Sequence, residues 1–328
     1  MQLHQLKFLL LSLVLLFAGN PGYSNAQTAP KKQSEIPVKI YSVIHGSPGD
    51  PFWAVYRKGL ADAARDFNVE LTDLGPTKFS IQEHVELLNS TIAARPQGII
   101  SSVVNVDAND EPLRRAISSG IPVIAVNVKD PRPVGERIPY LFYIGTDNEL
   151  AGRAVAQRIV DTKKPKRAVC TISEAGNLTT ELRCRGATAV FAENGIQTDK
   201  LLTGTNPTQV GEILKGYFAN QPDTEALVLS GVPNTQPGLQ ALEEAGLASK
   251  VAMGTFDLSG PILDGIKANK ILVSVAQQQY LQGYLAVQFL SLNIRYGFSA
   301  ANDVLTGPTV LDSTNIDRFI AAVKDGYS

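Results

Sequence analysis

Planar polar side chains follow several of the strands that this sequence predicts. The members of the set are Asp50, Asn105, Asn127, Arg183, Asn234, Asp257 and Gln277. Carboxylate, amide and guanidinium groups each offer paired donors or acceptors, and neighbouring hydroxyl groups of a sugar or polyol match that geometry. Three aromatic residues, Phe52, Trp53 and Phe256, can cover the apolar C–H face of such a ring. The combination predicts a binding site for a polyhydroxylated small molecule.

Each of these residues also has an ordinary structural explanation. Asn127 and Asp257 can cap helices, Arg183 can be a solvated helix charge, and Phe52 and Trp53 can pack their loop against the core. What favours a ligand role is their shared place beyond the carboxyl ends of predicted strands. In open α/β sheets, ligands bind at that edge.

The residues needed for catalysis or for metal binding are few. Beyond the N-terminal segment the chain has two histidines, His45 and His84, and His84 is expected on the surface of a helix. A zinc site or a Ser-His-Asp triad would therefore depend on His45 alone. No nucleophile elbow, no Walker A loop and no dinucleotide fingerprint is present. We expect no metal, no cofactor and no enzymatic activity; a glycoside hydrolase using Asp50 and Asp257 as paired carboxylates is the alternative.

A strand, a polar loop and a helix position the first of these residues. Residues 38–44 form a β-branched run of strand length, and a turn rich in Gly and Pro follows. After the turn, Val55, Gly59, Ala63 and Phe67 recur every four residues, which predicts an amphipathic helix.

The same alternation continues along the chain. Further strands are predicted at 69–74, 98–103, 121–126, 141–144, 168–172, 201–202, 226–229, 251–256, 271–276 and 304–311. Helices lie between them; Ser80 with Glu83, and Thr146 with Glu149, are predicted caps. Alternating strands and helices predict an α/β fold with doubly wound parallel sheets.

A Pro-rich break divides the alternation into two arrays. Residues 129–139 read as a connection, and the second array begins after Tyr140. Two similar lobes are therefore predicted, and a single large sheet is the competing arrangement. The last third of the chain does not fit a simple tandem, because a strand, a long helix and a final strand-like piece are left over.

Composition and the N-terminus indicate an exported globular protein. The chain has 328 residues, 44% of them hydrophobic, and a net charge of −1, which argues against a nucleic-acid partner. Lys7, an apolar run at 8–18 and the small residues Ser24 and Ala26 predict a cleaved signal peptide at 1–26, with an uncleaved anchor as the alternative. Residues 27–36 are expected to be a disordered leader.

The two cysteines, Cys170 and Cys184, lie in a predicted strand and in the helix after it. An exported protein would expose them to an oxidising compartment. The sequence leaves open whether they form a disulfide, since pairing requires closely spaced Cα atoms.

The chain resembles the periplasmic sugar-binding proteins of ABC transporters, of the ribose- and galactose-binding type. The matching pieces are Asp50-Pro51-Phe52-Trp53 with Gly59, Gly120 to Ile124, Gly145 to Asn148 with Gly152, Leu182 to Gly186, Thr255-Phe256-Asp257, and Ala276 to Tyr284. They occur in the family's order and span nearly all of the mature chain.

This resemblance implies a type I periplasmic binding protein fold, with two Rossmann-like doubly wound lobes joined by a three-segment hinge. The chain should cross between the lobes near Tyr140, Gln278 and Gly307. The implied lobes are 37–139 plus 278–307 at the N-terminal side, and 140–277 plus 308–328 at the C-terminal side.

The resemblance also assigns ligand-binding residues. By position, the first lobe supplies Asp50, Phe52, Trp53 and Asn127; the second supplies Arg183, Phe256 and Asp257, and Gln277 lies at a hinge. Asn105 and Asn234 are additional candidates from the strand pattern.

Several positions depart from the ribose-type pattern. Asp50 stands where that pattern has Asn, and Asn127-Val128 stands where it has Asp-Arg. An expected Asn is replaced by Gly231, with Asn234 as a substitute. Losing the Arg at Val128 removes a bidentate donor and argues against ribose. The stretch around Gly75 is similar to the autoinducer-2 binders of the family, which keeps that ligand open.

Taken together, the residues and the resemblance predict a monomeric periplasmic receptor that binds a neutral monosaccharide or polyol and presents it to an ABC transporter permease. The alternative is a sensor of a sugar or of autoinducer-2 that signals to a membrane chemoreceptor or kinase. A DNA-binding repressor of the related fold is excluded if the signal peptide is real.

Overall fold

The computed structural model describes residues 32–328, so the predicted signal peptide and the first half of the predicted leader, residues 27–31, lie outside the described residues. The residues from Gln33 onward form one compact unit. A short 3-10 helix, η1 (Gln33–Glu35), opens this unit. Arg295 donates to the carbonyl oxygens of Gln33 and Ile36, so the prediction of a disordered leader is wrong for its last residues.

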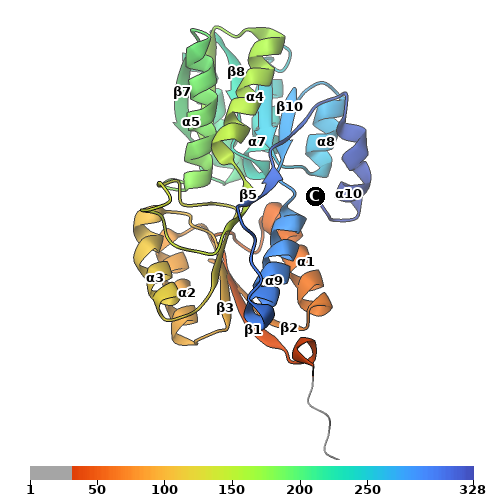
Figure 1. The fold of residues 1–328 in the computed structure, drawn as a ribbon. Helices are drawn as coiled ribbons and strands as arrows, with labels where there is room; N and C mark the ends of the chain where they lie inside the picture. Colours follow the sequence, from red (N-terminus) through yellow and green to blue (C-terminus); the bar gives the residue numbers. More distant parts are fainter. Residues whose placement is uncertain (1–31) are drawn as a thin grey trace, which may run out of the picture. The chain divides into compact units, whose positions relative to one another are not determined.

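The first sheet contains six strands in the order β11-β5-β4-β3-β1-β2, all parallel. Their bounds are β1 (Val38–Val43), β2 (Val69–Leu74), β3 (Gly98–Ser101), β4 (Val123–Val126), β5 (Tyr143–Thr146) and β11 (Val304–Gly307). Helices α1 (Pro51–Asp66) and α9 (Gln279–Tyr296) cover one face. Helices α2 (Ile81–Ala93) and α3 (Val106–Ser118) cover the other (Figure 1). The apolar strands are thus buried from both sides, as their continuous hydrophobic runs require.

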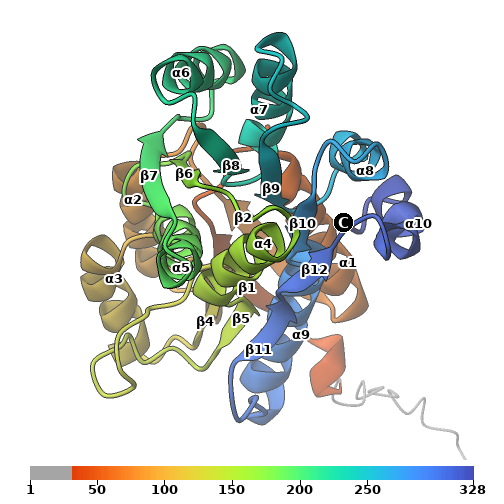
Figure 2. The same cartoon turned by 90° about the horizontal axis from the view of Figure 1, so that it is seen from above.

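The second sheet repeats this arrangement, in the order β12-β10-β9-β8-β6-β7. Its strands are β6 (Arg167–Ile172), β7 (Gln197–Leu202), β8 (Thr224–Val228), β9 (Ala252–Phe256), β10 (Val273–Ala276) and β12 (Thr309–Leu311). All are parallel except β12, which is antiparallel to β10. Helices α4 (Asn148–Lys163) and α5 (Leu178–Glu193) lie on one face, and α6 (Pro207–Asn220), α7 (Val232–Glu244) and α8 (Gly260–Lys267) on the other (Figure 2). The chain ends with η2 (Ile316–Phe319) and α10 (Ile320–Lys324), which pack beside α8.

The chain passes between the two sheets after β5, between β10 and α9, and between β11 and β12. The first passage differs from the prediction, which put it near Tyr140 and assigned this strand to the second lobe. Strand β5 instead pairs with β4 and β11 in the first sheet, and Leu141 N already donates to the carbonyl oxygen of Val123. The final strand-like piece splits into β11 and β12, one in each sheet.

The helix starts follow the capping chemistry in the sequence, with two corrections. Ser80 Oγ accepts a hydrogen bond from Glu83 N at 3.1 Å, but the Glu83 carboxylate accepts from Thr77 N rather than from Ser80 N. The cap of α4 is Asp147 and not Thr146: Asp147 Oδ1 accepts from Leu150 N at 3.0 Å.

The described chain has the predicted class: two α/β sheets of mostly parallel strands with helices interleaved. Among the helices of residues 32–328, none combines the length and the apolar character needed to span a bilayer.

Candidate functional site

A cavity whose water-accessible volume is about 60 Å³ lies at the carboxyl ends of the strands and takes residues from both lobes. The first lobe contributes His45, Asp50, Phe52, Trp53 and Asn127. The second contributes Ser173, Glu174, Asn177, Thr179, Thr180, Arg183, Thr205, Ser230, Gly231, Val232, Pro233, Asp257 and Gln277. The structure thus brings Asp50, Phe52, Trp53, Asn127, Arg183, Asp257 and Gln277 together around one space, as their places at strand ends predict.

The loop between β1 and α1 holds the aromatic wall of the cavity. Trp53 is buried and packs edge-on against His45, with ring centroids 4.9 Å apart, and against Phe52 at the same distance. Arg57 secures the loop: its Nε donates to Asp73 Oδ2 at 2.7 Å, and its terminal nitrogens reach the carbonyl oxygens of residues 46 and 47. A rigid aromatic surface of this kind suits the apolar face of a ring.

Gly46 is what lets the indole of Trp53 lie against this loop. A Cβ atom at Gly46 would fall 2.0 Å from Trp53 Cδ1 and Nε1. The loop can therefore carry no side chain at this position unless Trp53 moves.

Asn127 and Asp257 both leave their strands in the left-handed backbone conformation, with φ of 62° and 71°. Asn and Asp tolerate that region better than most residues, which explains these residue types at strand ends. The carbonyl oxygen of Asn127 accepts from Tyr143 Oη at 2.8 Å and from Asn148 Nδ2 at 3.2 Å. Its side-chain amide has no hydrogen-bond partner within residues 32–328 and lines the cavity.

Arg183 is buried and held in place from three sides. Its Nε donates to Asn148 Oδ1 at 3.0 Å, its Nη1 donates to the carbonyl oxygen of Ser230 at 2.7 Å, and its guanidinium lies 4.4 Å from the ring centroid of Phe256. Burial lowers the pKa of Arg183, and the carboxylate of Asp257 opposes that shift. The group stays a cation, because guanidinium groups do not lose their proton in proteins.

Gln277 fixes the carboxylate of Asp257. Gln277 Nε2 donates to Asp257 Oδ1 at 2.5 Å, and both residues are almost completely buried. Burial raises the pKa of Asp257, while Arg183 and the hydrogen bond from Gln277 act in the opposite direction. Among the described residues, Gln277 Oε1 finds no donor although it is buried.

Two further carboxyl groups line the cavity, one from each lobe. Asp50 caps α1, since its Oδ1 accepts from Phe52 N at 2.9 Å. Burial raises the pKa of Asp50 to about 6; this hydrogen bond opposes the shift and the nearby Asp257 adds to it. Glu174 Oε2 accepts from Asn177 Nδ2 at 2.5 Å. Burial raises the pKa of Glu174 to about 7, with Asn177 opposing and Asp50 adding to the effect.

His45 is a neutral member of the site. Its Nδ1 lies 2.9 Å from Ser102 Oγ. Burial, helped by His84 and Arg183, lowers the pKa of His45 to about 3. His84 is not on a surface, as was predicted, but fully buried between Val43 and Asn109.

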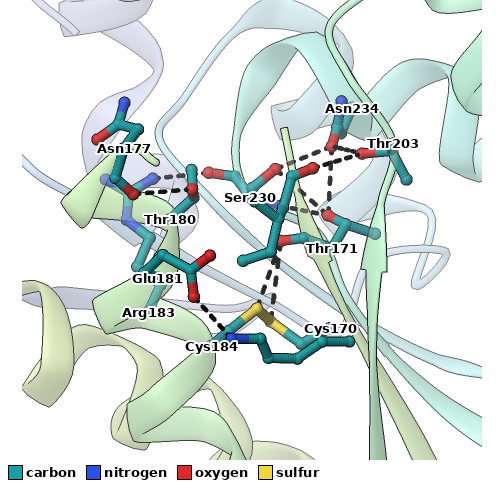
Figure 3. The surroundings of a disulfide bond; sticks show 12 residues. Cys170, Thr171, Asn177, Thr180, Glu181, Arg183, Cys184, Thr203, Ser230 and Asn234 are labelled. Carbon is teal, nitrogen blue, oxygen red and sulfur yellow. Dashed lines mark hydrogen bonds and ion pairs between the residues drawn. A yellow bond between two sulfur atoms is a disulfide. The ribbon is translucent and has the colours of Figure 1, made fainter. Parts of the chain in front are cut away.

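Three predicted ligand residues lie outside the lining of the cavity. Asn105 caps α3, with its Oδ1 accepting from Ala108 N at 3.0 Å. Asn234 is fully buried, and its Oδ1 accepts from the hydroxyl groups of Thr171, Thr203 and Ser230 (Figure 3). Phe256 lies beneath the Arg183 guanidinium and positions it.

Gly231 lines the cavity together with residues 230, 232 and 233, whereas Asn234 does not. The φ of Gly231 is 152°, and a Cβ there would lie 3.3 Å from Asp257 Oδ2. The exchange of Asn for Gly therefore leaves the space beside Asp257 open.

The prediction missed several lining residues, above all Glu174, Asn177 and Thr205. Glu174 could have been found, because it lies two residues after the apolar strand at 168–172, although Asn127 and Asp257 follow their strands directly. Asn177 and Thr205 lie in loops whose course the strand pattern does not reveal.

A disulfide between Cys170 and Cys184 joins β6 to α5, with Cα atoms 5.7 Å apart (Figure 3). It settles the question that the sequence left open. Because Arg183 precedes Cys184 on the same turn of α5, the bond also anchors the helix that carries the guanidinium.

Within residues 32–328, no group of three or more acidic, histidine or cysteine side chains is arranged to hold a metal ion. The carboxylates, amides and guanidinium of the cavity are instead arranged as hydrogen-bond partners for a small polar molecule, with aromatic rings at one side.

Comparison with known sequences identifies a family and several relatives of this chain. Residues 40–295 match the model of the periplasmic binding protein domain. The xylose/arabinose-binding protein XylF of Sulfolobus acidocaldarius is 25% identical over 298 residues, which cover 87% of this chain and 74% of that protein. The D-allose-binding periplasmic protein of Escherichia coli is 22% identical and covers 72% of this chain and 78% of its own.

Solved structures agree in fold over almost the whole described chain. A carbohydrate transporter protein of Acidothermus cellulolyticus in complex with myo-inositol has a TM-score of 0.82 and 27% identity, covering 89% of this chain and 100% of that one. A periplasmic sugar-binding protein of Legionella pneumophila has a TM-score of 0.77 and 28% identity, covering 82% and 99%. This chain therefore belongs to the periplasmic binding protein family, among the sugar-binding proteins with the type I fold.

Proposed function

We propose that the protein is the sugar-binding component of an ABC transporter. In the periplasm it binds a monosaccharide or polyol in the cavity between its lobes and delivers it unchanged to the permease. The observation that carries this proposal is the cavity itself: both lobes line it with planar polar side chains, and Phe52 and Trp53 form an aromatic wall.

The arrangement of the site supports binding by lobe closure. Asp50 and Asn127 come from the first sheet, Arg183 and Asp257 from the second, and Gln277 lies where the chain passes between them. A ligand held by both sets favours the closed form, because it contacts groups that only closure brings together.

The relatives supply a first panel of ligands. A thermal-shift screen of the purified protein would include myo-inositol, xylose, arabinose, allose and their common isomers. A ligand present at 100 times its dissociation constant adds about 2.7 kcal/mol to the free energy of unfolding, which gives a clear rise in melting temperature. Repeating the screen after unfolding and refolding removes any ligand that copurified. No shift with any sugar or polyol would contradict the proposal.

Delivery to a permease is tested in cells. Deleting the gene should abolish uptake of the radiolabelled ligand, and restoring it should restore uptake. Unchanged uptake would point to sensing instead. Sustained release of product from sugar glycosides would point to hydrolysis by Asp50 and Asp257.

A further inference from the structure

Acidic side chains outnumber basic ones in the lining of the cavity. Asp50, Glu174 and Asp257 contribute carboxyl groups, whereas Arg183 is the single lining residue with a permanent positive charge. His45 is neutral, since its pKa is lowered to about 3. We propose, building on the sugar-binding function above, that the preferred ligand is an amino sugar or amino polyol whose protonated amine lies between the carboxylates of Asp50 and Glu174.

Arg183 does not neutralise these acids directly. It donates to the side chain of Asn148 and to the carbonyl oxygen of Ser230, and its guanidinium covers Phe256. Within residues 32–328 it forms no ion pair with any of the three carboxylates. Its donors hold the second lobe together, and its positive charge acts on Asp257 and Glu174 through space without a hydrogen bond to either.

Each of the three carboxyl groups keeps one oxygen free of protein hydrogen bonds. Asp50 accepts through Oδ1, Glu174 through Oε2 and Asp257 through Oδ1. In the described part of the chain, nothing donates to the other oxygen of each. Asp257 is 4% exposed and its free oxygen borders the cavity beside Gly231, so this acceptor is within reach of a ligand. A protonated primary amine carries three N–H donors and can satisfy such acceptors.

The pair chosen for the amine spans the two lobes. Asp50 caps α1 in the first lobe, and Glu174 follows β6 in the second. Each is close enough to act on another acid: Asp50 raises the pKa of Glu174, and Asp257 raises that of Asp50. Closure of the lobes therefore brings like charges together. A cation between them turns this repulsion into attraction and makes ligand binding and closure favour one another.

A neutral ligand would leave Asp50 and Glu174 without a cation between them, and their raised pKa values show that these carboxyl groups then tend to keep a proton. Hydroxyl groups can donate to the free oxygens, but hydrogen bonds to a charged donor are stronger, and they are stronger again where water is excluded. The remaining groups suit the uncharged part of the ring: the amide of Asn127 and the pair formed by Asp257 and Gln277 face its hydroxyls, and Trp53 faces its C–H surface.

Matched pairs of ligands test the proposal. Isothermal titration near neutral pH would compare glucosamine with glucose, galactosamine with galactose, and an amino-cyclitol with myo-inositol, each with its N-acetylated form as a control without charge. In at least one pair we expect the amine to bind at least about tenfold more tightly than its neutral partner, a difference of about 1.4 kcal/mol. The N-acetylated form should lose that advantage.

Two variants locate the amine. Glu174→Gln and Asp50→Asn should each reduce the ratio of amine to neutral affinity by about tenfold or more. Asn is also a good helix cap, so Asp50→Asn keeps the start of α1. Each substitution removes a carboxyl group whose charged form is disfavoured by burial, so both variants should fold. Glu212→Gln, on the exposed side of α6, is the matched control and should leave the ratio unchanged.

The outcomes separate this proposal from the proposed function. If neutral sugars bind as tightly as their amines in every pair, or if the preference for the amine survives both variants, the amine proposal is overturned while the sugar receptor stands. If neither sugars nor amino sugars bind, both are overturned.

Discussion

Asn127 and Asp257 occupy matching positions in the two lobes. Each follows the fourth strand of its lobe, β4 or β9, each has a left-handed backbone, and each lines the cavity from its own side. The repeated βα architecture thus places the amide of Asn127 and the carboxylate of Asp257 in the lining of the same cavity, one from each lobe. This pairing guides the choice of substitutions, because a residue that cannot adopt positive φ would disturb the loop as well as the ligand.

The variant Asp257→Asn removes the negative charge of this side chain and keeps the left-handed backbone conformation. Asn tolerates the left-handed conformation, whereas Ala at this position would add strain. Loss of a charge-assisted hydrogen bond, worth about 1.5 to 3 kcal/mol, should weaken ligand binding by roughly ten- to a hundredfold in isothermal titration. The melting temperature of the free protein should not fall, since burial already disfavours this carboxylate. Asp264→Asn, on the exposed side of α8, is the control; equal affinities of the two variants would exclude Asp257 from the site.

Gln277→Met tests the support that Asp257 receives from the hinge. The variant removes the 2.5 Å hydrogen bond to Asp257 Oδ1 and also removes an unpartnered buried oxygen. Folding stability should change little, because the two effects oppose each other. Without this donor the pKa of Asp257 rises further, so ligand affinity should fall and should fall more steeply as the pH is lowered. Gln82→Met, on the exposed face of α2, should behave as wild type; a pH profile identical to wild type in the Gln277 variant would contradict the argument.

The single tryptophan of the sequence lies in the cavity wall, so its fluorescence should report ligand binding. Gly46→Ala should move the indole, because the new Cβ would lie 2.0 Å from it. We expect a changed emission spectrum, weaker ligand binding and a loss of about 1 to 3 kcal/mol in the free energy of unfolding, as overpacking usually costs. Gly49→Ala is the matched control in the same loop, since nothing lies within 4 Å of its Cβ position. If both variants bind ligand like wild type, the position of Trp53 does not matter for binding.

The disulfide should stabilise the fold more than it alters ligand contacts. Cys170 and Cys184 enclose a short loop with a sequence separation of 14, for which loop-closure entropy predicts about 3 kcal/mol. Urea unfolding with and without reductant should show this loss. The double variant Cys170→Ser/Cys184→Ser should lose a similar amount and no longer respond to reductant, because the chain has no other cysteine. A reductant effect that persists in the double variant would assign it to something else.

The order of strands and helices could be predicted because most buried strands are continuous apolar runs and several helices have an apolar stripe, although α5 and α9 have almost none. What the pattern could not reveal is the sheet to which a strand belongs. Strand β5 reads as the start of a second array after a Pro-rich stretch, yet it pairs with β4. Sheet partners depend on contacts between distant residues. Only the resemblance to a family, and not the local sequence, predicted three passages between lobes.

The site was predicted as far as strand ends define it. Asn127 and Asp257 follow strands directly, and Asp50 caps the helix after the first strand; all three reach the cavity. Asn105 and Asn234 are asparagines like Asn127, but their side chains already form hydrogen bonds with nearby groups. Asn105 Oδ1 accepts from a backbone N–H, and Asn234 Oδ1 accepts from three hydroxyl groups. Short polar side chains compete for such nearby partners, and sequence alone does not show which partner wins.

The pH dependence of stability offers a test of Glu174 that needs no ligand. Its pKa is raised from 4.5 to about 7, so the folded protein holds this proton more tightly than the unfolded chain does. The stabilising contribution of the protonated group is complete below about pH 4.5 and is lost as the pH rises through 7. The Glu174→Gln variant has no titrating group at this position, so its free energy of unfolding should not show this loss. Relative to wild type, its free energy of unfolding should therefore increase with pH by about 1 to 3 kcal/mol in urea titrations, since each pKa unit is worth about 1.4 kcal/mol.

Asp50, Arg183 and Asn177 face this carboxyl group and are present in both proteins, and the opposite contributions of His45 and His84 cancel in the difference. A difference that stays constant with pH would mean that Glu174 is not held in the buried, acid-rich setting from which the preference for an amine was inferred.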